Sequence, residues 1–175
     1  MFGQQYQGQD TTSAGSGFIV GQNDKELLIA TNNHVIDGAK TISVQFIDEQ
    51  IYEATVKGTD SSNDLAVIAV QTSKIKESTM NKIRVADLGD SSKIKVGEMA
   101  VAIGNALGYG QSVTVSYISA KDREISESES GSSSSSSSNT IKAIQTDAAI
   151  NPGNSGGALL NICLLYTSDA ADEAR

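Results

Sequence analysis

The chain has 175 residues and a formal net charge of −8, from 21 acidic and 13 basic side chains. This length predicts one domain with a sizeable core, and the acidic balance without clusters of Lys and Arg excludes nucleic acid and anionic membrane surfaces as expected partners. With one cysteine, Cys163, and one histidine, His34, we expect neither an intrachain disulfide, nor a metal site, nor a cofactor. No stretch reaches the ~18 apolar residues of a membrane span, and the polar start predicts no signal peptide.

Short apolar or alternating runs fill most of the chain after a lead-in, residues 1–14, that is rich in Gln, Gly and Thr and predicts a flexible segment. Turn-forming residues such as Gly21–Asp24 separate the runs, and long helical periodicity is missing. Many short strands predict an all-β barrel or sandwich. The expected strands are 17–20, 27–31, 41–47, 51–56, 65–70, 96–103, 112–119, 141–146 and 158–161.

Two polar stretches interrupt this pattern. Residues 71–81 are expected to link two halves of the domain, and residues 124–139 include seven consecutive serines, Ser132–Ser138. A tract that buries almost nothing apolar predicts a flexible loop. Composition alone leaves open whether this serine-rich loop is a passive linker or regulates the protein.

The stretch from Thr146 to Leu160 places Ser155 in a glycine-rich turn. A serine hydroxyl needs a base to become a nucleophile, and glycines at 153, 156 and 157 allow positive φ and close approach of the backbone to a substrate. The same residues fit a plain turn between two strands. They also fit the nucleophile elbow of α/β-hydrolases, but that fold needs its histidine after the serine, whereas His34 lies far upstream.

A catalytic triad in the chain order His, Asp, Ser is compatible with a histidine that lies upstream of the serine. His34 is the base by elimination, and the ordinary pKa of a histidine side chain, ~6.5, suits proton transfer around neutral pH. Asp60 and Asp64 both compete for the third role. We select Asp64, because it directly precedes an apolar strand that would hold and partly desolvate it, whereas Asp60 lies among turn residues. The N–H groups of Gly153 and Ser155, with Asn154 between them, are the expected oxyanion donors.

These residues together resemble the HtrA/Deg family of trypsin-like serine proteases, over most of the chain. The resemblance implies a chymotrypsin/trypsin-like double β-barrel, with the first barrel at about 15–72 and the second at about 83–161. It implies an endopeptidase that cleaves unfolded or damaged proteins in protein quality control. The segments that carry the resemblance are Gly15–Ile19, Thr31–Ile36, Asp64–Val67, Leu88–Ser91, Val96–Gly97, Ala102–Asn105 and Thr146–Leu160.

Partners and location also follow from the resemblance. It implies unfolded protein or peptide substrates, a homotrimer with Phe2 and Tyr6 at its contacts, a PDZ domain downstream, and a location outside the cytoplasm. It places a regulatory loop where this chain has its serine-rich tract, and Arg123 matches an arginine that supports the active form. We therefore interpret the tract as a modulator of activity.

The residues after Asn161 depart from the family pattern. The string from Cys163 to Glu173 resembles translated sequencing-adapter read-through, so we expect residues 162–175 to be a non-native tail. The second barrel would then lack its closing strand and leave an unpaired edge. This possibility keeps a second function open, namely a catalytically impaired or chaperone-like module that binds unfolded polypeptide.

Overall fold

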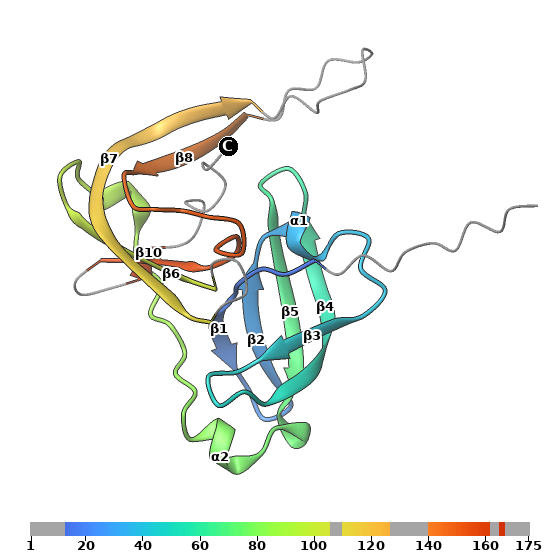
Figure 1. Ribbon diagram of the computed structural model, residues 1–175. Helices are drawn as coiled ribbons and strands as arrows, with labels where there is room; N and C mark the ends of the chain where they lie inside the picture. Colours follow the sequence, from blue (N-terminus) through green and yellow to red (C-terminus); the bar gives the residue numbers. More distant parts are fainter. Residues whose placement is uncertain (1–12, 106–109, 127–139, 162–164, 167–175) are drawn as a thin grey trace, which may run out of the picture.

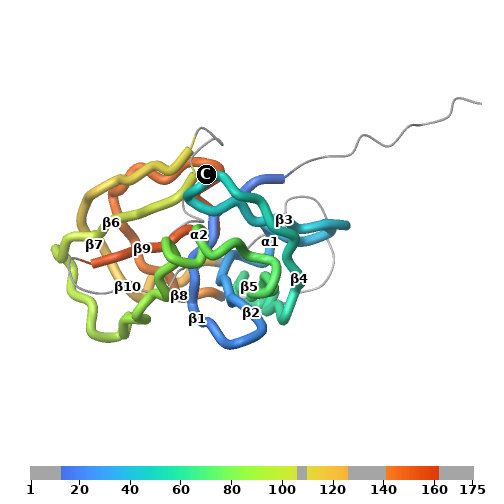
Figure 2. Tube along the Cα trace, turned by 90° about the horizontal axis from the view of Figure 1, so that it is seen from below, coloured from blue at the N-terminus to red at the C-terminus, as the bar shows by residue number. Residues whose placement is uncertain are grey.

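Two antiparallel β-sheets of five strands each form the fold. The computed structural model describes residues 13–105, 110–126, 140–161 and 165–166 of the chain. In Figure 1 the first sheet lies on one side and the second on the other, and Figure 2 shows the same two halves side by side when seen from below. The loop between β8 (Thr140–Thr146) and β9 (Ala158–Leu160) reaches from the second sheet toward the first. The predicted all-β fold is confirmed.

The first sheet has the strand order β1-β2-β5-β4-β3. Strand β2 alternates between half-buried and buried residues, as expected for a strand with one face on the core. The predicted β1–β2 hairpin is present, and Asn23 Oδ1 accepts hydrogen bonds from the N–H groups of Lys25 and Glu26 in its turn. The strands are β1 (Phe18–Gln22), β2 (Glu26–Thr31), β3 (Ile42–Gln45), β4 (Ile51–Asp60) and β5 (Leu65–Gln71).

The second sheet has the order β10-β9-β6-β7-β8, and its barrel is not closed, as the sequence predicts. Of the tail expected to be non-native, residues 165–166 are described, and they pair with β9. Strand β7 continues to Ser126, so the first three residues of the predicted serine-rich loop belong to a strand. The strands are β6 (Met99–Gly104), β7 (Ser112–Ser126), β8 (Thr140–Thr146), β9 (Ala158–Leu160) and β10 (Leu165–Tyr166).

Each sheet has its own apolar core. In the first, Leu27 and Val70 are fully buried; in the second, Ala100 is fully buried and Ile94, Ile118 and Leu159 nearly so. The two clusters share no residue. Hydrogen bonds around the β8–β9 loop join the two halves, and the N–H of Ala86 also donates to the carbonyl of Ile19 on β1 at 2.8 Å.

The polar link between the sheets contains short helices that the sequence pattern did not indicate. These are η1 (Thr72–Lys74) and α2 (Glu77–Met80), with η2 (Ser91–Lys93) further along. Thr79 is buried in α2, and its hydroxyl donates to Asp48 Oδ2 at 2.6 Å in the β3–β4 turn. This hydrogen bond lowers the pKa of the Asp48 carboxyl, because it stabilises the ionised form.

Several sequence expectations lie on residues outside the described ones: the lead-in up to residue 12 with Phe2 and Tyr6, the serine-rich tract from 127 to 139, and most of the tail. Among the helices that are described, none is long and apolar enough to cross a membrane.

Candidate active site

His34 lies in the first turn of a short helix, α1 (Asn33–Ile36), directly after β2. The N-cap residue, Asn32, makes no side-chain cap to this helix. Asp64 satisfies the helix start instead: its carbonyl accepts from the N–H of Asn33 at 3.1 Å, and its Oδ1 accepts from the N–H of His34 at 2.8 Å. A residue thirty positions along the chain thus caps the helix that carries the histidine.

The second carboxylate oxygen of Asp64 lies 2.6 Å from Nδ1 of His34. The His34 side chain is 45% exposed and that of Asp64 only 10%, so a partly exposed imidazole lies against a largely buried carboxylate. Asp60, the competing candidate, is exposed and accepts hydrogen bonds from Ser62 and Asn63 in its own turn. The structure therefore pairs His34 with Asp64, as the sequence predicts.

Asp64 has an uncommon backbone conformation, with φ of +48°. Its carbonyl accepts a second hydrogen bond, from Nδ2 of Asn32 at 2.8 Å, in a buried position. These two bonds to one carbonyl hold the residue in this conformation. The carboxylate is consequently fixed by its backbone as well as by His34.

Ser155 lies in the loop between β8 and β9, after a tight turn. The N–H of Asn154 donates to the carbonyl of Asn151 at 3.0 Å, and Gly153 has φ of +98°. A turn from Asn151 to Asn154 with positive φ at its third residue is a type II turn, which favours proline at the second position and glycine at the third, as Pro152 and Gly153 provide. Among the described residues, the N–H groups of Gly153 and Ser155 donate to no protein acceptor.

The other two glycines serve contacts with the protein itself. A Cβ on Gly156, where φ is +79°, would overlap Oγ1 of Thr31 and the carbonyl oxygen of Ser16. A Cβ on Gly157 would overlap the carbonyl of Ile103 on β6. The close neighbours of Gly156 and Gly157 are thus the first sheet and β6, and the expectation that these glycines let the backbone approach a substrate stays a prediction.

Two residues that sequence reasoning did not single out join this loop to the first sheet. Oδ1 of Asn32 accepts the N–H of Gly156 at 2.5 Å, across 124 positions of sequence. Ser16 donates its N–H to the carbonyl of Ser155 and its hydroxyl to the carbonyl of Gly153, both at 2.7 Å. Since Asn32 also holds Asp64, one buried amide connects the acid to the serine loop. Both residues lie inside the quoted motifs, which was the available signal.

The structure thus holds a histidine–aspartate pair and a serine loop together between two antiparallel sheets. Comparisons with known proteins show which family has this arrangement. The trypsin-like peptidase domain family matches residues 15–163. The chain belongs to this family. A probable periplasmic serine endoprotease, DegP-like, from Hahella chejuensis is 42% identical over 154 residues, which cover 88% of this chain and 28% of that protein.

Other relatives are of the same type. The serine protease Do-like HtrA of Bacillus subtilis is 42% identical over 87% of this chain and 32% of its own length. The solved structure of the HtrA-type protease AlgW with a tripeptide has a TM-score of 0.65 at 40% identity, and covers 85% of this chain and 43% of that one. The resemblance to HtrA/Deg proteases is thereby confirmed. The chain spans between about a quarter and a half of the length of these relatives.

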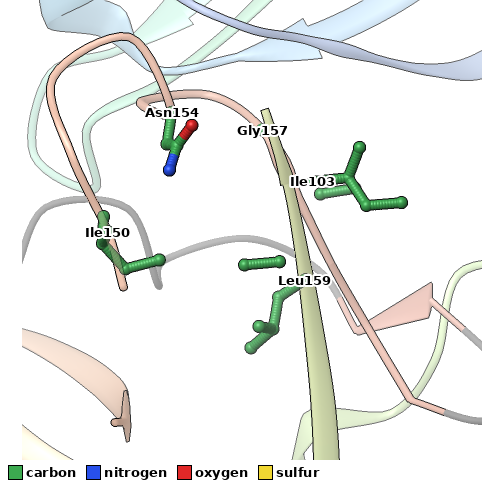
Figure 3. Close-up of a pocket in the computed structure, with 7 residues that line it drawn as sticks. Ile103, Ile150, Asn154, Gly157 and Leu159 are labelled. Atoms are coloured by element: carbon green, nitrogen blue, oxygen red, sulfur yellow. The ribbon is translucent and has the colours of Figure 1, made fainter. Parts of the chain in front are cut away.

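The side chain of Asn154 anchors the serine loop of this peptidase domain in the second sheet. Asn154 is buried and lies against Gly104 at the end of β6. A Cβ on Gly104 would come within 3 Å of Asn154, so only a glycine at position 104 leaves space for the asparagine side chain. Figure 3 shows Asn154 and Gly157 above an apolar recess between Ile150 on one side and Ile103 and Leu159 on the other. The recess has room for about one water molecule (about 10 Å³), too little for a substrate side chain.

The start of the same loop is held by β7. Oδ1 of Asp147 accepts from the hydroxyl of Ser116 and from the N–H of Tyr117, the latter at 3.1 Å. Both hydrogen bonds lower the pKa of the Asp147 carboxyl, because they stabilise its ionised form, and the bond from Ser116 has the larger effect. The loop that carries Ser155 is thus anchored by the second sheet at its entry.

Arg123, the candidate of the regulatory loop, is exposed on β7 opposite Ala143, after an irregularity in the ladder. None of the hydrogen bonds described above for the serine loop involves it.

In the described ranges no three side chains of His, Cys, Asp or Glu gather in a way that could hold a metal ion.

Proposed function

We propose that this domain is a serine endopeptidase in which Ser155 is the nucleophile, His34 the general base and Asp64 the residue that orients His34. The observation that carries the proposal is the 2.6 Å contact between Nδ1 of His34 and the carboxylate of Asp64, in the structure whose buried Asn32 also binds the serine loop. With Nδ1–H donated to Asp64, the other ring nitrogen is the one that accepts a proton.

In the proposed reaction, the Ser155 hydroxyl attacks the carbonyl carbon of a peptide bond while His34 takes the hydroxyl proton. His34 then gives this proton to the leaving amine, and the acyl group remains on Ser155. Water, activated by His34 in the same way, releases the acid and restores the hydroxyl. The buried carboxylate of Asp64 stabilises the imidazolium that forms in both steps.

Stabilisation of the oxyanion is assigned to the N–H groups of Gly153 and Ser155, on either side of Asn154. Two features support this: both groups are unpaired within the described residues, and the type II turn fixes the peptide that precedes Gly153. Loss of one such donor typically lowers kcat by about 10²–10³-fold.

Labelling with a fluorophosphonate probe tests the proposal. The probe should modify Ser155 in the wild-type chain, and His34→Ala should abolish this labelling, while Ser61→Ala, in an exposed turn, should leave it intact. Wild-type protein that is folded and unlabelled, or labelling that survives His34→Ala, would show that the assigned triad is wrong.

Substrates, location and assembly are proposed from the relatives. Unfolded or damaged polypeptides are the proposed substrates, and the periplasmic names of several relatives support an extracytoplasmic location. We further propose a peptidase domain over 15–161, a homotrimer and a PDZ domain in the parent protein, and a role of Arg123 and the serine-rich tract in regulation. Deletion of Ser126–Ser138 with unchanged turnover would refute that last role.

A second candidate function is binding of unfolded polypeptide without cleavage. An apolar face of β7 favours it: Val113, Val115 and Tyr117 alternate along the strand and are each more than half exposed. Such a face can hold apolar segments of an unfolded chain. A pull-down with reduced, unfolded α-lactalbumin distinguishes the two functions, because binding without cleavage products would favour this candidate and time-dependent fragments would favour the protease.

A further inference from the structure

The segment before β1 has no part in the chemistry proposed above, although it belongs to the residues that carry the family resemblance. Ser16 lies in this segment. We infer that Ser16 is a positioning residue for the oxyanion donors: it holds the carbonyl groups on both sides of the Asn154–Ser155 peptide, and so fixes the direction of the Ser155 N–H. This inference rests on the proposed function of Ser155.

Every polar group of Ser16 is used at the junction of the two sheets. Its N–H donates to the carbonyl of Ser155 at 2.7 Å, and its hydroxyl donates to the carbonyl of Gly153 at 2.7 Å. The same hydroxyl oxygen accepts the N–H of Asn105 at 2.8 Å, and the Ser16 carbonyl accepts from the hydroxyl of Thr31 at 2.7 Å. A serine hydroxyl has one donor and two acceptor positions, so this pattern requires the side chain and not only the backbone.

Three successive peptides of the loop, from Gly153 to Gly156, show how the Ser155 N–H is held. The peptide between Gly153 and Asn154 is bound at both ends, by the hydroxyl of Ser16 and by the carbonyl of Asn151. The peptide between Ser155 and Gly156 is also bound at both ends, by the N–H of Ser16 and by Asn32. The peptide that carries the Ser155 N–H lies between these two fixed peptides, and its own carbonyl, that of Asn154, accepts the N–H of Gly157 at 2.8 Å. Because the peptide is planar, holding its carbonyl also sets the direction of the Ser155 N–H.

A glycine-rich loop needs such external contacts. Glycines at 153, 156 and 157 lose more conformational freedom on ordering than other residues, and only two hydrogen bonds are internal to the loop, from Asn154 to Asn151 and from Gly157 to the Asn154 carbonyl. Donors that stabilise a transition state must be in place before the reaction. Ser16 supplies two of the contacts that keep them there.

The hydroxyl of Ser16 also joins the two sheets at this point. Asn105 directly follows β6, in the second sheet, whereas Ser16 leads into β1, in the first. A Cβ on the preceding Gly15 would overlap the side chain of Val35 and lie 3.2 Å from the Ser155 carbonyl, so the segment passes close between α1 and the serine loop. One side chain therefore ties β6, the serine loop and the first sheet together.

The variant Ser16→Ala tests the inference, because it removes the hydroxyl and leaves the N–H to Ser155. Thr72→Val is the matched control: it removes a hydroxyl that donates to the carbonyl of Asp24 at 2.8 Å, away from the site. Both are made in the full chain and assayed well below their melting temperatures, so that a lower folded fraction does not contribute.

Two readouts are compared with the wild type. In Ser16→Ala we expect the second-order rate constant of fluorophosphonate labelling to fall about 10- to 100-fold, part of the loss typical of a missing oxyanion donor. The apparent pKa of the acidic limb of its pH profile should stay as in the wild type, because His34 and Asp64 are untouched. Thr72→Val should change neither.

Amide hydrogen exchange provides the readout that does not depend on catalysis. In Ser16→Ala the N–H groups of Asn154 and Gly157 should exchange faster than in Thr72→Val. A wild type that is not labelled refutes the proposed function, and the exchange result then still tests the positioning. Labelling of Ser16→Ala at the wild-type rate, or exchange equal to that of Thr72→Val, would overturn the inference.

Discussion

The side chain of Asn32 connects the two halves of the site, and its removal gives the sharpest test of the geometry. Asn32 is 5% exposed, and its amide accepts the N–H of Gly156 and donates to the carbonyl of Asp64. In Asn32→Ala the N–H of Gly156 is left without this acceptor in a buried position, which costs about 1–3 kcal/mol. The carbonyl of Asp64 keeps its bond from Asn33, so the second loss is smaller, about 0.5–1.5 kcal/mol.

The sum predicts that Asn32→Ala lowers the free energy of unfolding by about 1.5–4.5 kcal/mol. For a domain of this size 1 kcal/mol lowers Tm by about 2–4 °C, so Tm should fall by about 3–18 °C. Thermal unfolding followed by circular dichroism measures this. Asn63→Ala is the control, because Asn63 is exposed and its amide donates to Asp60 at 2.7 Å; it should cost at most about 0.5 kcal/mol.

Two outcomes of this comparison bear on the reasoning. A Tm loss in Asn32→Ala no larger than in Asn63→Ala would refute the view that the buried amide stabilises the junction. A large Tm loss accompanied by slower labelling of Ser155 at temperatures where the variant is folded would support its role in joining the Asp64 carbonyl to the serine loop.

Three further predictions concern the loop, the core and the link. Gly156→Ala combines positive φ with steric overlap and should cost at least about 2 kcal/mol in chemical denaturation, whereas Gly38→Ala, with φ of +67° and no atom within 4 Å, should cost about 1 kcal/mol; equal losses would contradict the packing argument. Leu27 is fully buried, so Leu27→Ala should lower the free energy of unfolding by about 2–5 kcal/mol. Ile47 is 74% exposed, so Ile47→Ala should lower it by at most about 0.5 kcal/mol, and similar urea midpoints for the two variants would contradict this. The hydrogen bond from Thr79 holds the folded-state pKa of Asp48 below the ordinary value of an aspartate, so the stability that Asp48 contributes is present above that ordinary value and is lost as pH falls through the lowered one. The free energy of unfolding should therefore fall less between pH 5 and pH 3 in Asp48→Asn than in the wild type, and equal losses would refute this.

The strands and the histidine–aspartate pair were accessible from the sequence because their signals are local. Short apolar runs mark β2 and β6, and Asp64 was distinguished from Asp60 by the apolar run that follows it at once. Burial of that strand also buries Asp64, whose side chain is 10% exposed, as the pattern implied. The catalytic roles of these residues remain predictions until labelling tests them.

The contacts of Ser16 and Asn32 were not accessible in this way. They join residues 137 and 124 positions apart, and neither a small hydroxyl nor an amide near a strand end signals such a partner. The helix α2 was missed for a different reason, since four residues are too few to show a period. The only signal in the sequence was that Ser16 and Asn32 lie inside motifs of the family resemblance while no chemical role was assigned to them.

The separation of the two cores explains why these polar contacts matter more to the site than to the fold. Each sheet buries its own apolar residues, while the serine loop meets the first sheet through hydrogen bonds of Ser16 and Asn32. A hydrogen bond contributes about 0.5–1.5 kcal/mol net, less than a buried leucine or isoleucine, so the junction opens more readily than either core. Ser16 and Asn32 therefore act on the serine loop directly, through the hydrogen bonds that join it to the first sheet.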